Sequence, residues 1–203
     1  MLMGNSILMT KLDQKTHTYT DEKGPLSGVT SLLGDAGLID FSMIPEAMRG
    51  HYMDRGSKVH RATQLLDEDD LDFNALDPVL KKYVEGYNKF RSDFHGRYKI
   101  ISMEIIVRHP IQRYAGKIDR VCIIDGELAV LDIKSGALQD WVALQTEGYR
   151  QAHNAENVDK IEARYALALS KEGKYKLKKY SDAGDAAVWL AVVALARWKG
   201  KIK

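Results

Sequence analysis

The sequence predicts an α/β fold in which helices flank a central mixed β-sheet. Three observations support this prediction. Apolar residues recur at helical spacing within residues 1–97, β-branched residues are frequent in residues 100–133 around a two-residue turn, and helical and strand patterns then alternate to residue 198. Such elements bury their apolar faces by packing in layers around one core. Because 203 residues suit one domain, we expect a single domain over 1–203.

The N-terminal part, about 1–97, is expected to hold a hairpin followed by helices. Residues 6–12 and 16–20 suit two short strands around Asp13-Gln14-Lys15. Proline is favoured in the first turn of a helix, where its missing N–H group is not needed. The predicted helical segments are 29–38, one opening at Pro45, 56–66 and one opening at Pro78.

The rest of the chain alternates between strand and helix patterns. Strands are expected over 100–107, 115–124 and 127–133. Asp125-Gly126 separates the last two, and this dipeptide is typical of a tight hairpin because both residues tolerate positive φ. The remaining elements are a helix over 139–157, strands over 161–169 and 175–180, and a helix over 182–198.

The composition narrows the class of protein. Hydrophobic residues make up 45% of the chain, which is enough for a core, and no apolar run reaches the roughly 18 residues that span a bilayer. The first residues lack a secretory signal, so we expect a cytoplasmic protein, bacterial or from a phage-infected host, with no membrane partner. The single cysteine, Cys122, excludes a disulfide or a four-cysteine metal site within the chain. The net charge of +2 neither demands nor forbids a nucleic-acid partner.

Asp132 and Lys134 place charge at the end of an apolar strand. Alternation puts both side chains on one face, with Leu131 and Ile133 on the other. The carboxylate can hold a divalent cation, and the ammonium can lie near a water or a phosphate in the same site. The same spacing of an acid and a lysine recurs in apparent turns or strand ends, where charge is ordinary, at Asp13–Lys15, Asp21–Lys23 and Glu172–Lys174.

Asp119 interrupts the preceding strand, and the hairpin turn predicts its neighbour. If the turn is tight, residue 124 faces residue 127, and Asp119 then lies opposite Asp132. Directly opposed residues have Cβ atoms about 4.5–5.5 Å apart, so two carboxylates there repel unless a cation binds between them. The alternative is a pair of surface acids, each neutralised by a lysine.

Two upstream residues are candidates with ordinary alternatives. Glu104 lies in mid-strand between apolar residues, where a salt bridge to Lys117 or Arg120 would explain it. His60 lies in an expected helix beside Val59, where a histidine is more often packed than a metal ligand.

Five short motifs follow one another along the chain. They are Gly56-Ser57-Lys58-Val59-His60, Glu104, Gly116-Lys117-Ile118-Asp119, Asp132-Ile133-Lys134 and Gln145-Thr146-Glu147-Gly148-Tyr149. Gln145 and Tyr149 are four apart and share a helix face. In order and spacing the motifs resemble the RecB-type nucleases of the PD-(D/E)XK superfamily. Residues 27–33 also resemble the corresponding segment of small phage-encoded members, which are exonuclease-like.

The resemblance implies a restriction-endonuclease-like core and a role for each motif. The implied metal ligands are His60, Asp119, Asp132 and the main-chain carbonyl of Ile133. The implied catalytic residues are Lys134, Asp132, Asp119 and Glu104. Lys134 would orient the attacking water and stabilise charge on phosphorus, while Glu104 would bind a second metal or support the first. Gln145 and Tyr149 would position the nucleic-acid strand or the catalytic groups.

The implied activity is hydrolysis of DNA phosphodiester bonds with Mg²⁺ or Mn²⁺. By resemblance, the enzyme would be an exonuclease that acts on single strands or duplex ends and leaves a 5′-phosphate and a 3′-hydroxyl. The iron–sulfur cluster of several relatives is excluded by the lone Cys122, and without a helicase motif the expected partner is a helicase or recombination protein. Residues available for strand contact are Tyr149, Arg150, Tyr175 and 176–179.

Four alternatives remain open at this level. The chain could be an inactive nucleic-acid-binding module of the same fold, although every expected catalytic position is filled. It could be a metal-dependent endonuclease, or a metal-dependent hydrolase of another substrate. It could also be an unrelated α/β protein, which would bind no divalent metal.

Overall fold

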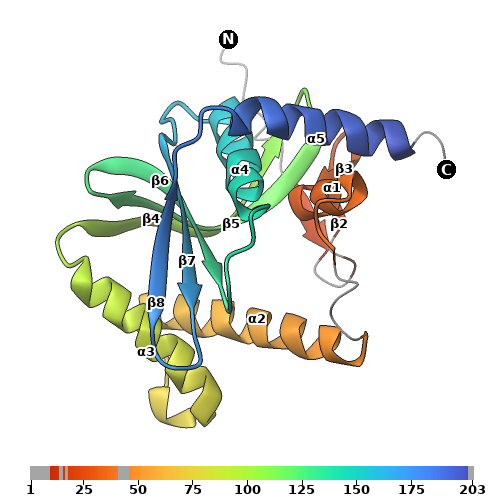
Figure 1. The fold of residues 1–203 in the computed structure, drawn as a ribbon. Helices are drawn as coiled ribbons and strands as arrows, with labels where there is room; N and C mark the ends of the chain where they lie inside the picture. Colours follow the sequence, from red (N-terminus) through yellow and green to blue (C-terminus); the bar gives the residue numbers. More distant parts are fainter. Residues whose placement is uncertain (1–9, 14–15, 17, 41–45, 201–203) are drawn as a thin grey trace.

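The computed structural model describes residues 10–13, 16, 18–40 and 46–200, and the structural statements below refer to these residues. They form an eight-stranded mixed sheet in the order β1-β2-β3-β5-β6-β7-β8, with β4 paired to β5 outside this path. Helices flank the sheet, as Figure 1 shows. The predicted α/β class with a central mixed sheet is confirmed.

The strands are β1 (Lys11–Asp13), β2 (Thr18–Asp21), β3 (Gly24–Gly28), β4 (Tyr98–His109), β5 (Tyr114–Ile124), β6 (Glu127–Lys134), β7 (Ala163–Leu169) and β8 (Tyr175–Tyr180). The helices are α1 (Val29–Ala36), α2 (Glu46–Asp67), α3 (Pro78–Asp93), α4 (Val142–Glu156) and α5 (Asp185–Gly200), with a 3-10 turn at Phe73–Ala75. No described helix has the length and apolar character needed to cross a bilayer.

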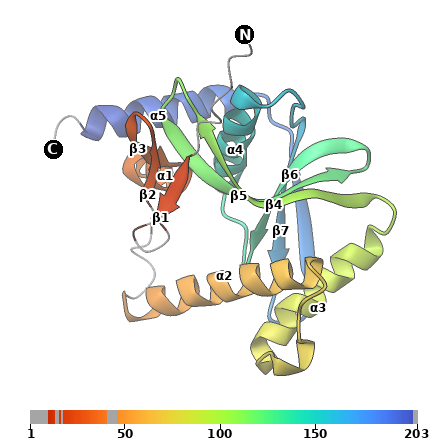
Figure 2. The same cartoon turned by 180° about the vertical axis from the view of Figure 1, so that it is seen from behind.

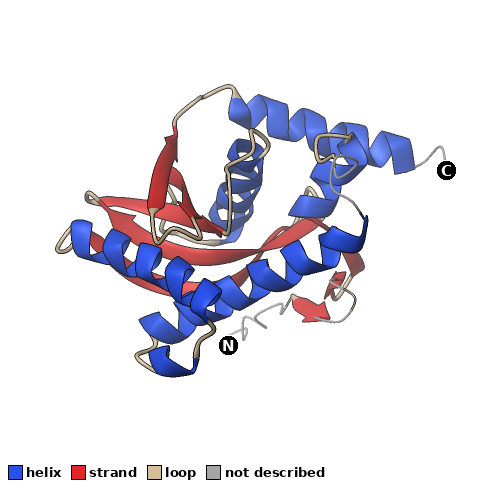
Figure 3. Cartoon of the chain, turned by 60° about the horizontal axis from the view of Figure 1, so that its bottom comes forward, coloured by secondary structure: helices blue, strands red, loops and turns tan. Residues whose placement is uncertain are grey.

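The two larger apolar cores of the described residues lie on opposite faces of the sheet, and a third, small cluster contains Val142, Ala166 and Tyr180. One packs the sheet against α1, α4 and α5 around the buried Trp189. The other packs it against α2 and α3 around Phe90, and Figure 3 shows these two helices crossing that face. Within β6, Val130 belongs to the first core, whereas Leu131 and Ile133 belong to the second. Alternation therefore places Asp132 and Lys134 on the α4 side of the sheet.

Two sequence-based predictions need correction. The helical segments predicted at Pro45 and at 56–66 belong to one helix, α2, and Pro45 itself lies outside the described residues. Strand β3 was not predicted, because its sequence GPLSG is typical of a turn. The N-terminal hairpin is present as β1 and β2 in antiparallel pairing, while its residues 6–9 lie outside the described part.

The parallel pair β6 and β7 determines where the site lies. The two strands are neighbours over Ala129–Lys134 and Ala163–Ala168, so their carboxyl ends reach the same edge of the sheet. Helix α2 runs past that edge in both Figure 1 and Figure 2. Residues at the carboxyl ends of parallel strands commonly form ligand sites, and Lys134 is the last residue of β6.

Candidate metal and catalytic site

The β5–β6 hairpin has the predicted register. Ile124 pairs with Glu127, and the ladder continues to the pair Arg120 and Leu131. Asp125 and Gly126 have φ values of 54° and 86°, as a tight hairpin turn requires. The recorded pairing ends there, and beyond it Asp119 Oδ2 accepts a hydrogen bond from Ile133 N at 2.7 Å, next to Asp132 in the chain. Asp119 and Asp132 are 6% and 3% exposed, so the alternative of surface acids is wrong.

Lys134 is held beside Asp132. Its Nζ lies 2.8 Å from Asp132 Oδ2 and donates to Gln145 Oε1 at 2.8 Å. Apart from this ion pair, Asp132 Oδ2 has no hydrogen-bond partner among the described residues. Burial raises the pKa of Asp132; Lys134 opposes this rise, and the charge of Asp119 adds to it. A buried carboxylate oxygen in this state favours the binding of a cation.

Asp119 belongs to a group of three side chains that could bind a metal ion. His60 Nδ1 lies 3.2 Å from Asp119 Oδ1, and one ligand atom each from His60, Glu104 and Asp119 lies within 4.8 Å of the others. Burial would raise the pKa of Asp119, but the charge and hydrogen bond of His60, the charge of Lys134 and the hydrogen bond from Ile133 together lower it. Burial would lower the pKa of His60, but Asp119 raises it overall. Carboxylates with one imidazole suit Mg²⁺ or Mn²⁺, so these residues fit such an ion.

Glu104 occupies an unusual backbone position. Its φ of 53° is left-handed, although it lies inside β4, and for a residue with a Cβ this costs roughly 1–2 kcal/mol. Its carboxylate forms ion pairs with Lys117 and with Arg120, the latter at 3.3 Å. The two salt bridges considered as alternatives from the sequence, to Lys117 and to Arg120, are therefore both present. The same side chain also belongs to the ligand group around Asp119, and strain of this kind is common at functional sites.

Helix α2 places His60 next to the sheet. Contacts made by residues before and after His60 hold the helix in position. Arg55 Nη2 donates to the main-chain oxygen of Ser135 at 3.1 Å. At the carboxyl end of α2, Asp67 forms a fully buried ion pair with Arg120 at 2.8 Å. Because these contacts bracket His60, the helix cannot rotate or slide without breaking one of them.

Gln145 contacts both Lys134 and Tyr149. Gln145 Nε2 donates to Thr30 Oγ1 at 3.0 Å and to the Tyr149 hydroxyl at 3.2 Å. A Cβ on Gly116 would lie 2.5 Å from the Tyr149 ring, so this glycine lets the ring lie against β5. Both side chains are buried, and the contacts described for them orient Lys134. Contact with nucleic acid remains a prediction for this pair.

Three residues of this arrangement were not identified from the sequence. Thr30 and Asp67 gave no signal, because each meets its partner across a long sequence separation. Arg120 was considered only as a salt-bridge partner of Glu104. Its place inside an apolar strand, directly after Asp119, could have marked it as a buried charge.

Most of the residues expected to contact a strand have other partners. Arg150 pairs with Glu147. The Tyr175 hydroxyl donates to Asp93, and its ring packs against Phe90. Lys179 pairs with Glu127, and Lys178 lies over the Tyr180 ring. Tyr149 is buried. Of this set, Lys176 forms no ion pair with a described residue.

Comparisons with known proteins identify a related fold. No protein-family model matches the sequence, and no curated protein matches it. The structure is similar to a crystal structure of a protein from Eubacterium rectale that has a provisional exonuclease assignment, with a TM-score of 0.57 and 14% identity over 87% of this chain and 82% of that one. The crystal structure of LHK-Exo in complex with dAMP is also similar, with a TM-score of 0.36 and 14% identity over 87% of this chain and 88% of that one. At this identity the first similarity shows a common fold.

Proposed function

We propose that this chain is a metal-dependent nuclease that hydrolyses phosphodiester bonds of DNA. The observation that supports the proposal is a group of three potential metal ligands next to a buried pair of a carboxylate and a lysine. The three ligands are His60, Glu104 and Asp119. The pair is Asp132 with Lys134, and it lies on the strand whose Ile133 amide donates to Asp119. Similarity to the fold of a provisionally assigned exonuclease supports the same reaction class.

Each residue then has a chemical role. His60, Asp119, Asp132 and the carbonyl of Ile133 would hold a divalent ion, and Glu104 would bind a second ion or support the first. A bound Mg²⁺ or Mn²⁺ would supply positive charge beside the phosphate and lower the pKa of water there. The Lys134 ammonium, held by Gln145, would orient the water and face the negative charge that grows on the phosphate oxygens. The products would carry a 5′-phosphate and a 3′-hydroxyl.

The proposed setting is processing of DNA ends in the cytoplasm. The enzyme would act as an exonuclease on single strands or duplex ends, without an iron–sulfur cluster and together with a helicase or recombination protein. The competing proposals are an endonuclease and an inactive module that binds nucleic acid. A filled set of acidic, histidine and lysine positions favours turnover over the inactive module.

An Asp132→Ala variant tests the catalytic assignment. The wild type should degrade linear DNA with Mg²⁺ or Mn²⁺ and be inactive in EDTA. The variant should lose hydrolysis by at least a hundredfold while remaining folded, because removing an incompletely paired buried carboxylate relieves a desolvation cost. Lys99→Ala, on exposed strand surface, is the control and should retain wild-type rates. Unchanged turnover by Asp132→Ala protein would contradict the assignment.

A further inference from the structure

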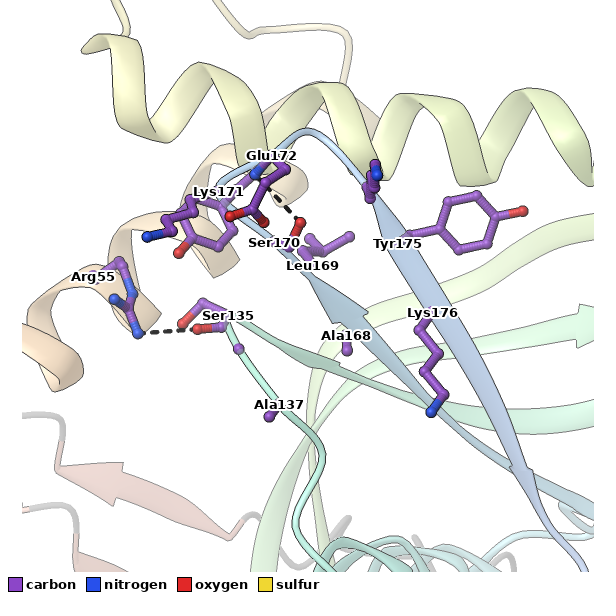
Figure 4. Close-up of a pocket in the computed structure, with 13 residues that line it drawn as sticks. Arg55, Ser135, Ala137, Ala168, Leu169, Ser170, Lys171, Glu172, Tyr175 and Lys176 are labelled. Atoms are coloured by element: carbon purple, nitrogen blue, oxygen red, sulfur yellow. Dashed lines mark hydrogen bonds between the residues drawn. The ribbon is translucent and has the colours of Figure 1, made fainter. Parts of the chain in front are cut away.

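A groove lies beside the catalytic lysine. It has a volume of about 440 Å³ and lies between α2, the loop that follows β6, and the β7–β8 hairpin. Its lining includes Ser135, which directly follows Lys134 in the chain. In Figure 4, Arg55 and Lys176 lie on opposite sides of the groove, with Ser135 and Ala168 between them. The groove therefore begins next to Lys134 in the chain, and its lining includes none of the residues assigned above to the active site.

Strand pairing connects the groove to Lys134. Lys134 pairs with Ala168 on β7, and Ala168 pairs with Lys176 on β8. Residues paired across a ladder point to the same face, so these three form one row across the sheet. With strands 4.7–4.9 Å apart, the two lysines are separated at the backbone by about 10 Å. Ala168 lies between the two lysines, and its small side chain leaves space above the sheet for a ligand.

The groove is lined by four basic side chains and one acidic one. The basic residues are Arg55, Lys171, Lys174 and Lys176, and the acid is Glu172. A hydrogen bond from Ser170 lowers the pKa of Glu172, and the charges of Lys171 and Lys174 lower it further. Two of the four basic side chains therefore lie near the one acid. Lys176 forms no ion pair with a described residue.

Arg55 is already positioned for a ligand. One of its guanidinium nitrogens donates to Ser135, and the group lies over the rings of Tyr52 and Tyr83. Arg55 also lines the groove. A guanidinium that lines a groove and is held in place suits a phosphate oxygen.

We propose that this groove binds the sugar–phosphate backbone of a single nucleic-acid strand, next to the phosphate held at Lys134. The inference rests on the proposed nuclease function and names a binding site for its substrate. Arg55 and Lys176 contact backbone phosphates on the two sides of the groove. The volume lies in the range of pockets for small ligands, about 300–1,000 Å³, and suits a nucleotide-sized part of one strand. Contacts to phosphates carry no base preference, so binding is independent of sequence.

Binding measured without turnover tests the groove. Fluorescence anisotropy of a labelled 12-nucleotide thymidylate strand is followed in EDTA, over 50–200 mM salt. Loss of one phosphate contact reduces the slope of log K against log salt by about 0.7, which is about fivefold in affinity at 0.1 M. Lys176→Ala and Arg55→Gln should each show this loss. Lys179→Ala removes the same charge from the opposite face of β8, where it pairs with Glu127, and should change neither quantity.

A charge-neutral variant separates the groove from general electrostatics. Ala168→Phe fills the floor and should weaken binding of the strand at least fivefold, with melting temperature and circular dichroism confirming the fold. Wild-type affinity in both Lys176→Ala and Ala168→Phe, or no binding by the wild type, would overturn the proposal. If these variants lose as much affinity for a blunt duplex as for the single strand, the assignment of the groove to a single strand is overturned.

The same experiment distinguishes the two proposals. If the strand binds as described but no DNA is hydrolysed with Mn²⁺, the nuclease proposal fails and the groove stands. If DNA is hydrolysed and the groove variants bind normally, the groove alone fails.

Discussion

At the scale of single residues, Asp119 uses its two carboxylate oxygens for different purposes. Oδ1 faces His60, and Oδ2 accepts the main-chain hydrogen of Ile133. One side chain therefore both closes the end of the hairpin ladder and contributes to the ligand group. Substitution at this position affects local structure as well as chemistry, so a metal effect has to be separated from a folding effect.

The stability of the protein should respond to divalent metal. An ion bound only to the folded state stabilises it by mass action, by about 2.7 kcal/mol at one hundred times Kd. For a domain of this size that corresponds to a rise of about 5–10 °C in melting temperature. Differential scanning fluorimetry with millimolar Mn²⁺ should show this rise in the wild type and lose it in the Asp119→Asn, Asp132→Asn double variant.

Asp125→Asn provides the control for that measurement. It removes a carboxylate from the same hairpin at an exposed turn, and asparagine tolerates the positive φ of 54° there. This variant should keep the full response to Mn²⁺. A wild-type melting temperature that is indifferent to Mn²⁺, Mg²⁺ and EDTA would contradict the metal site.

The sequence predicts some of these residues better than others for a physical reason. The Asp125-Gly126 turn sets the register, so the approach of Asp119 to the end of β6 that carries Asp132 could be predicted from local sequence alone. The partner of Arg120 lies 53 positions away in an acidic run, where no spacing rule selects Asp67 from its neighbours. Side chains paired within one hairpin can be predicted, whereas those paired across layers require the fold.

At the scale of elements, the buried ion pair between Arg120 and Asp67 joins the end of α2 to the sheet. Burial raises the pKa of Asp67, although Arg120 opposes this, so the carboxylate depends on its partner. Arg120→Leu should destabilise the protein by about 3–5 kcal/mol, because it leaves a buried charge without compensation. Urea unfolding measures the loss, and the Arg120→Leu, Asp67→Leu double variant should recover part of it.

A surface pair on the same helix is the control for this cycle. Asp54 and Lys58 form an ion pair at 2.7 Å with side chains 60% and 59% exposed. Their alanine variants should change stability by less than about 1 kcal/mol, since exposed pairs contribute little. If Arg120→Leu costs no more than the surface variants, Arg120 does not fix α2.

The sequence predicted the bounds of helices and strands best where apolar residues recur at a regular spacing. Residues 175–180 and the start of the helix at Pro78 agree with β8 and α3. Helix α2 was divided into two segments because its sequence contains Gly50 and Gly56 and its buried residues are few. The carboxyl-terminal elements agree within a few residues, since packing and not periodicity sets their exact ends.

At the scale of the whole molecule, the proposed site is recessed. Its depth favours substrates that can reach buried carboxylates. The two central aspartates are 6% and 3% exposed, so in the proposed reaction a scissile phosphate would have to reach into the protein. A free strand end can enter such a site more easily than a continuous duplex. We therefore expect a covalently closed circle to be degraded at least tenfold more slowly than the same molecule after linearisation.

Gel electrophoresis of matched closed, nicked and linear forms with Mn²⁺ measures this difference. Rates should fall as salt rises and should depend little on sequence, because backbone contacts dominate. Equal rates on closed and linear DNA would indicate an endonuclease. That result would leave the metal site in place and remove the end-processing role.

The order of the sheet is the part of the molecule that the sequence predicted least. Parallel pairs such as β3 with β5 and β6 with β7 join strands that are distant in the chain, and no turn sets their register. The groove depends on one of these pairs, because Ala168 comes to lie beside Lys134 only through it. A site of this kind follows from topology and cannot be predicted from motif spacing.

The hydrogen bond from Ile133 to Asp119 also makes one backbone amide a reporter of the site. Elsewhere in this hairpin, amide protons exchange with solvent deuterium when the ladder opens. The Ile133 proton is held by a side chain instead, so its exchange rate follows the state of that carboxylate. A single amide resonance could therefore follow the site in solution, in the absence of any substrate.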